Sequence, residues 1–216
     1  MNTLLKLVAD SYGLLPLLAI ILLVAATVIV ERLAFFSKSV RSAANLQHDL
    51  DKVKRGNLVD IQKIAQHYEG TIQAAVVRSG IAHHGDLEAD FERELENAIM
   101  FEMPKLDRNL WVLDTAVTLG PLVGLFGTIA GMISSFNVLG SSGTGNPLAV
   151  SGGIANALIA TGFGLTIAIL GLVFLNFFNK QVRNTVLQLD LVQSMLTIRL
   201  AATPHVEARL SAISHN

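Results

Sequence analysis

A run of 65 consecutive residues without an ionisable side chain, residues 115–179, constrains this chain more than any other feature. A second run, residues 11–30, contains no Asp, Glu, Lys or Arg. A membrane-spanning helix needs about 20 apolar residues, so the shorter run can cross a bilayer once and the longer run twice. The segment "GSSGTGNP" (140–147) has the residue types of a turn between those two crossings. The sequence therefore predicts an all-α membrane protein with three transmembrane helices.

These runs predict how the chain is divided. The transmembrane helices cover residues 12–30, 115–139 and 148–179. Between the first and second helices lies a large helical cytoplasmic segment, residues 31–114. The remaining parts are a short N-terminal periplasmic segment that could be amphipathic, a periplasmic turn, and a cytoplasmic C-terminal helix and tail: residues 1–11, 140–147 and 180–216.

The basic residues predict this orientation. Eleven of the 16 Lys and Arg residues lie in residues 32–108, four follow the third span, and the loop between spans two and three has none. Cytoplasmic loops carry the excess of Lys and Arg, so the C-terminus is expected inside and the N-terminus outside. A cleaved signal peptide is the alternative for the first span, but its apolar run is long and its positive charges follow it.

The composition and the motifs of the chain argue against several classes of function. Charged residues make up 15% of the chain, against about a quarter in soluble domains. The net charge of -1 does not favour nucleic acid, and the absence of cysteine excludes thiolate metal sites. No catalytic grouping or phosphate loop is present. We therefore expect no enzyme activity, no cofactor and no metal.

The cytoplasmic segment contains one strongly patterned helix, in "GDLEADFERELENAIMFEMPKLDRNLWVL". Asp86 is placed to cap its start, and Pro104 should kink or break it. Beyond Pro104 the pattern could join the second span in one long rod. The acids of this helix are expected to form a solvated face, with a docking surface for a partner as the alternative. His83 and His84 predict a turn rather than a metal site.

Small residues mark one face of each later span. In the second span they are Gly120, Gly124, Gly127 and Gly131, with Thr128 at the edge. In the third span they are Gly153, Ala157, Ala160 and Gly164, bracketed by Asn156 and Thr161. Such faces let membrane helices approach closely. Packing alone would account for each polar group, but the two faces together could line a narrow ion pathway formed by Thr128, Thr161 and Asn156.

The predicted spans contain no Asp, Glu, His, Lys or Arg. Intramembrane acids mark the routes of protons and ions through membrane proteins. Residues 12–30, 115–139 and 148–179 contain none. If the chain conducts, the titrating group must come from another polypeptide.

The blocks "GPLVGLFGTIAGMISSF", "GGIANALIATGFGLTIAI" and "FLNFFNKQ" resemble the ExbB/TolQ/MotA family of ion-driven stator proteins in the bacterial inner membrane. Three spans agree with ExbB and TolQ, and ExbB is the nearer type. The resemblance implies a homopentamer around two copies of a single-span ExbD- or TolR-like protein, whose membrane aspartate carries the proton. It also places the family's pore threonines at Thr128 and Thr161.

This chain departs from the family pattern at Asn156, where glutamate is usual. The resemblance implies a subunit that uses the proton gradient to energise TonB-dependent import across the outer membrane. A TolQ-type role in the Tol-Pal envelope system is the alternative. Because asparagine cannot titrate, a sodium-using variant and a non-conducting scaffold also remain open.

Overall fold

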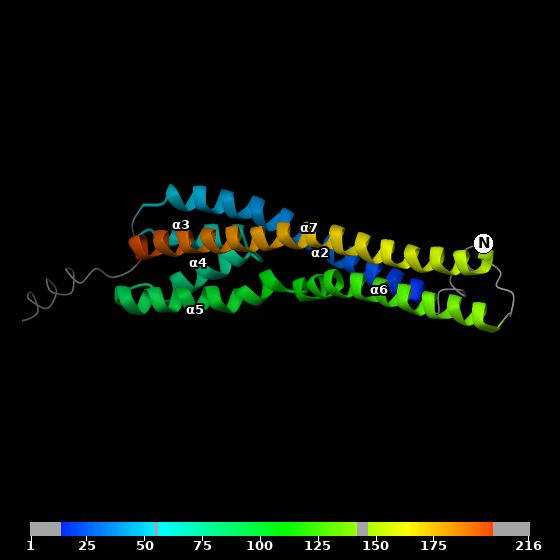
Figure 1. Ribbon diagram of the computed structural model, residues 1–216. Coiled ribbons are helices and arrows are strands. Elements are labelled where there is room, and N and C mark those ends of the chain that lie inside the picture. Colours follow the sequence, from blue (N-terminus) through cyan, green and yellow to red (C-terminus); the bar gives the residue numbers. More distant parts are fainter. Residues whose placement is uncertain (1–13, 55, 142–146, 201–216) are drawn as a thin grey trace, which may run out of the picture. The chain divides into compact units, whose positions relative to one another are not determined.

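The structure, a computed structural model, describes residues 14–54, 56–141 and 147–200, and this part of the chain is helical (Figure 1). The prediction of an all-α protein with three long apolar helices is confirmed. The expected N-terminal segment, most of the expected periplasmic turn and the C-terminal tail lie outside the described residues. The helices are α2 (Leu14–Asp51), α3 (Leu58–His67), α4 (Ile72–Ala82), α5 (Glu88–Asp107), α6 (Leu110–Ser141) and α7 (Pro147–Leu200).

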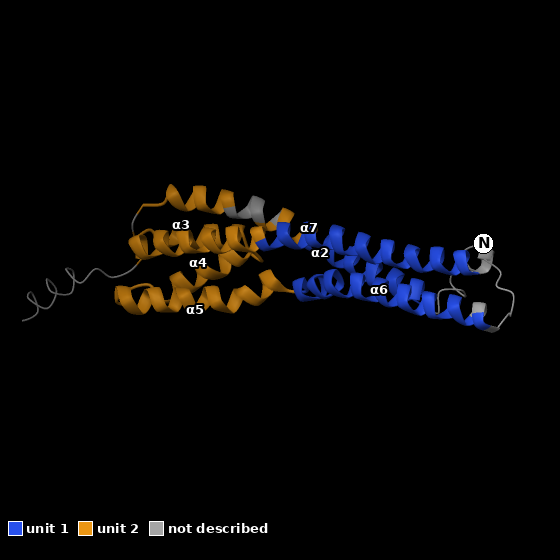
Figure 2. Cartoon of the chain, in the orientation of Figure 1, with its two compact units in different colours: residues 1–32, 109–179 blue, residues 33–108, 180–216 orange. Residues whose placement is uncertain are grey.

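The chain divides into two compact units (Figure 2). Unit 1 contains residues 1–32 and 109–179, and unit 2 contains residues 33–108 and 180–216. Helices α2 and α7 each contribute to both units, since they continue past the apolar runs. The long apolar stretches within Leu14–Ser37, Glu88–Asn137 and Val150–Leu200 are each sufficient to cross a membrane.

Unit 1 is held together by contacts among α2, α6 and α7. Leu18 of α2 packs with Ala160 and Ile167 of α7, and Val123 of α6 packs against this cluster. These helices are apolar on nearly all sides, as expected of helices whose outer surface faces lipid.

Unit 2 has a core made by one apolar stripe from each of its helices. Capping side chains begin two of them: Asn57 accepts a hydrogen bond from Asp60 N (3.3 Å), and Thr71 accepts one from Ala74 N (3.2 Å). The buried stripes include Leu46, Leu50, Ile61, Ala65, Val76, Val77, Phe91, Leu95, Leu189, Val192 and Leu196.

The expectation that Asp86 caps α5 is wrong: the N-cap residue is Leu87, which makes no side-chain capping bond. Of the kink or break expected at Pro104, the break does not occur, because α5 continues through this residue to Asp107. The rod expected to join α5 to the second span is interrupted at Asn109, whose φ of 62° lies in the left-handed region. The turn expected at His83 and His84 is confirmed.

Candidate functional site

The candidate site is the contact between α6 and α7 in unit 1. Backbone atoms of the two helices approach so closely that side chains would not fit between them. A Cβ atom placed on Gly120 would lie 2.9 Å from the carbonyl oxygen of Gly164, and one on Gly124 would lie 3.0 Å from Cα of Thr161. Only glycine tolerates this approach, as in other tightly packed membrane helices.

The contact continues toward the connection between the helices. A Cβ atom on Gly127 would lie 3.0 Å from Cβ of Ala160, and one on Gly131 would lie 2.6 Å from Cβ of Ala157. Gly153 faces the hydroxyl of Ser135. The structure therefore brings the small residues of the two spans together within a single chain: Gly120, Gly124, Gly127, Gly131, Gly153, Ala157, Ala160 and Gly164.

The two threonines lie beside one contacting pair. Thr128 follows Gly127 and Thr161 follows Ala160, and Gly127 and Ala160 face each other. The Thr161 hydroxyl donates a hydrogen bond across the contact to the carbonyl oxygen of Gly124 (2.7 Å). The buried Thr128 hydroxyl donates to the carbonyl oxygen of Leu125 in its own helix (2.7 Å). Within one chain, both protons are used in backbone contacts, and the hydroxyl oxygens keep lone pairs for a further donor or cation.

Asn156 lies at the margin of the same contact. It precedes Ala157, which packs against Gly131, and it is half-buried. Thr161 lies five positions further along the helix, or about 7.5 Å along the axis. A neutral amide at this position can donate and accept hydrogen bonds but cannot exchange a proton as a carboxylate does.

The opposite faces of these helices are bulky, apolar and exposed in the chain. They suit lipid or a neighbouring subunit, because the hydrocarbon region requires apolar surfaces. These exposed apolar side chains on α6 and α7 include Leu122, Leu125, Phe126, Ile133, Phe136, Leu158, Phe163, Ile169 and Val173.

Sequence reasoning missed two features of unit 1. Ser135, four residues after Gly131, is buried and donates to the carbonyl oxygen of Gly131 (2.9 Å). Its spacing from the glycines could have identified it. Arg32 is only 2% exposed at the end of this part of α2, and its guanidinium lies 3.6 Å from Glu31 Oε1. No sequence signal indicated that an arginine would be buried there.

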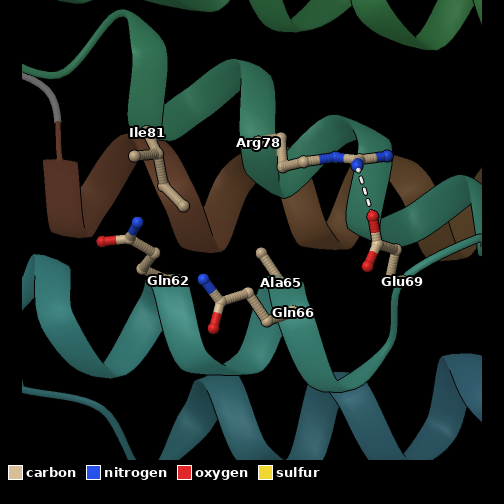
Figure 3. Close-up of a pocket in the computed structure, with 6 residues that line it drawn as sticks. All are labelled: Gln62, Ala65, Gln66, Glu69, Arg78 and Ile81. Carbon is tan, nitrogen blue, oxygen red and sulfur yellow. Dashed lines mark ion pairs between the residues drawn. The ribbon is translucent and has the colours of Figure 1, made fainter.

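A hollow of about 170 Å³ in unit 2 offers less chemistry (Figure 3). It is lined by Gln62, Ala65 and Gln66 on one side and by Arg78 and Ile81 on the other, with Glu69 paired to Arg78 at 3.6 Å. Among the described residues, no group of three or more His, Asp or Glu side chains could hold a metal ion. The hollow contains no nucleophile and base of the kind an active site needs.

The three apolar helices indicate a multi-span membrane protein. The α6–α7 contact at its candidate site contains no side chain that can titrate. The sequence profile of the MotA/TolQ/ExbB proton channel family matches residues 68–191. The chain belongs to this family, which is a family of proton channels and not a known enzyme class.

Several biopolymer transport proteins are similar to the chain. It is 36% identical over 168 residues to ExbB-like protein 3 of Synechocystis sp., and the match covers 76% of this chain and 79% of that one. It is 33% identical over 99 residues to ExbB of Xanthomonas campestris pv. campestris, covering 46% of this chain and 39% of that protein. The match to ExbB of Aquifex aeolicus is 33% identical over 88 residues, and it covers 41% of this chain and 60% of that protein.

A solved structure shares the fold. The structure of C. jejuni MotAB superposes with a TM-score of 0.59, covering 93% of this chain and 82% of that chain at 16% identity. At this identity the likeness concerns the fold alone. It supports the helical arrangement without assigning a role to any residue.

Proposed function

We propose that the chain is a proton-channel and motor subunit of the ExbB type in the bacterial inner membrane. It would act with a single-span, ExbD-like partner to energise TonB-dependent import across the outer membrane. The observation that carries this proposal is the α6–α7 contact. The chain belongs to a proton channel family, yet residues 115–179, which form this contact, contain no ionisable side chain. A proton needs a titrating group inside the membrane, so a partner must supply it.

In this proposal several copies of the chain, expected to be five, surround the partner. The threonines and Asn156 border the route on which the partner's carboxylate moves. Hydroxyl oxygens whose protons are already donated to Gly124 and Leu125 are oriented as acceptors. Such acceptors stabilise a protonated carboxyl group or a hydrated cation.

Reconstitution in liposomes tests the proposal. The chain alone should not carry protons, whereas the chain with its partner should, and replacing the partner's membrane acid by its amide should abolish the flux. Thr161→Val in the complete complex should reduce the flux by about two- to tenfold, the effect of losing one hydrogen bond. Thr161→Ser should restore it.

Thr166 provides a matched control on the same helix. Its hydroxyl donates to the carbonyl oxygen of Gly162 (2.8 Å), but its side chain is exposed on the outer face. Thr166→Val should leave the flux unchanged. Rapid proton flux through the chain alone would refute the proposal that a partner supplies the titrating group. Normal flux in Thr161→Val would show that Thr161 is not part of the pathway.

A second candidate function is favoured by Asn156. Without an acid at this position the complex could use sodium ions, or it could be a scaffold that does not transport. Sodium-dependent flux at a constant proton gradient would identify the first variant. Absence of flux in a correctly assembled complex, with flux gained in Asn156→Glu, would identify the second.

A TolQ-type role is the alternative to TonB-dependent import. It predicts that loss of the gene impairs envelope constriction rather than import.

A further inference from the structure

A groove of about 330 Å³ lies between the start of α5 and the last turns of α7, inside unit 2. Glu88 and Glu92 line it from α5. From α7 it is lined by Asp190, Gln193, Ser194, Thr197 and Ile198. Three acidic residues from two helices therefore line one concave surface.

These carboxylates have no counter-charge in the described part of the chain. Neither Glu88, Glu92 nor Asp190 forms an ion pair with another described residue. The nearby base on α5, Arg93, is engaged with Asp90 at 2.9 Å. Residues 86–96 contain six acids and this single base, so the groove lies in a strongly negative field.

Helix-terminus electrostatics explain only part of this cluster. Glu88 lies in the first turn of α5, where the helix dipole stabilises a negative charge. Glu92 lies beyond that turn, and Asp190 lies toward the carboxyl end of α7, where the dipole gives no such benefit. Helix termini therefore do not account for Glu92 and Asp190 in this groove.

Thr197 provides an independent observation. Its side chain is 8% exposed, and its hydroxyl has no hydrogen-bond partner among the described residues. Thr185, buried on the same helix, avoids this by donating to the carbonyl oxygen of Gln181 (2.9 Å). A buried hydroxyl without a partner is destabilising by about 1–3 kcal/mol. Thr197 lines the acidic groove, where a bound segment could supply the missing bond.

The rim of the groove is apolar. Ile198 lines it with 55% of its side chain exposed. Leu191, seven residues earlier on the same side of α7, is 56% exposed. An occupant would therefore meet carboxylates and a hydroxyl in the groove and aliphatic side chains beside it.

We propose that this groove binds a basic, amphipathic segment of a partner protein. Lysine or arginine side chains would pair with Glu88, Glu92 and Asp190, and an aliphatic residue would cover Ile198. Anionic ligands such as nucleic acid are disfavoured by charge. A metal ion is not favoured either, because the described residues contain no cluster of His, Asp or Glu that could hold one. This site is independent of the proposed ion pathway.

Peptide binding to the full chain in non-ionic detergent tests this inference. The probe is a fluorescent peptide with lysine and leucine at helical spacing, compared with one in which glutamate replaces lysine. The native chain should bind only the lysine peptide, and less tightly as salt increases. The triple variant Glu88→Gln, Glu92→Gln, Asp190→Asn should weaken binding about tenfold or more, as losing close charge pairs does.

Two further variants distinguish binding in the groove from non-specific attraction to the negative charge of the chain. The control Asp86→Asn, Glu96→Gln, Asp107→Asn changes the net charge equally at exposed acids that do not line the groove, and should bind within about twofold of the native chain. Thr197→Val keeps the charge and should weaken binding about three- to tenfold. Equal binding by the native chain and the groove variant would overturn the proposal. So would an equal loss in the control, or saturable Mg²⁺ binding by a chain that does not bind the peptide.

Discussion

At the scale of single residues, the glycines of the α6–α7 contact differ sharply from their neighbours. A Cβ atom on Gly164 would collide with the backbone of Gly120 and would lie 3.2 Å from Cα of Gly124. A Cβ atom on Gly162, two residues earlier, would meet nothing within 4 Å. The same substitution should therefore have opposite effects at these two positions.

Gly164→Ala should destabilise the chain by about 1–3 kcal/mol, the effect of overpacking a tight contact. Gly162→Ala should be neutral or stabilising by up to about 1 kcal/mol, because alanine favours a helix more than glycine does. Unfolding in mixed micelles measures both. Equal stability of the two variants would contradict the close backbone approach described for α6 and α7.

Asp49 and Tyr68 form a second residue-scale pair, in unit 2. The Tyr68 hydroxyl donates to Asp49 Oδ2 (2.8 Å). This hydrogen bond lowers the pKa of the Asp49 carboxyl group. Burial, followed by the bond to Asp49, raises the pKa of the Tyr68 phenol. A raised folded-state pKa stabilises the fold below the group's ordinary pKa, and this stabilisation is lost as the pH rises through the raised value.

Asp49→Asn should therefore lower the pKa of Tyr68 toward its ordinary value, leaving the part of the shift that burial causes. The alkaline loss of stability, which begins near the ordinary tyrosine pKa in both proteins, should therefore be smaller in this variant and should end at a lower pH. Tyrosinate absorbance measures the pKa in a Tyr12→Phe background, since the chain has two tyrosines. An unchanged or higher pKa would show that the hydrogen bond does not contribute.

At the scale of elements, the junction between α5 and α6 depends on one residue. Asn109 adopts a φ of 62°, and its side chain donates to Glu31 Oε2 (2.9 Å). Asn109→Ala should destabilise unit 1 by about 1–2 kcal/mol because alanine is strained in this conformation. Asn109→Gly should be nearly neutral, since glycine adopts it freely. If both variants lose equal stability in chemical unfolding, the bond to Glu31 is responsible, and Glu31→Ala should then reproduce the loss.

The elements also show what the sequence could and could not predict. The runs without charge and the glycine spacing of residues 120–131 identified the long apolar helices and their small faces, because both depend on local periodicity. The helix interruption at Asn109 could not be predicted in the same way. Pro104 is the stronger local signal for the end of a helix, and tertiary contacts decide which of the two residues interrupts it. Nor could the sequence show that Gln73 is fully buried in α4, or that Asp190 and Thr197 of α7 line one groove with Glu88 of α5, because these features depend on which helices pack together.

At the scale of the whole molecule, charge is separated along the chain. The apolar part of unit 1 has no ionisable side chain from residue 115 to residue 179, while acids and bases are plentiful in unit 2. If such a molecule forms the walls of an ion pathway, as we propose, the group that titrates inside the membrane must come from a partner. Its orientation in the membrane then decides which compartment can reach unit 2.

The absence of native cysteine allows a direct test of this orientation. Phe101 in unit 2 is 81% exposed, and Gly140 is exposed near the end of α6. Because Lys and Arg flank the cytoplasmic ends of membrane helices, an impermeant maleimide applied from the periplasm should label Gly140→Cys and not Phe101→Cys. Both should react after the cells are lysed, which shows that each thiol is accessible. Labelling of Phe101→Cys in intact cells would place unit 2 in the periplasm, and the acidic groove would then need a periplasmic partner.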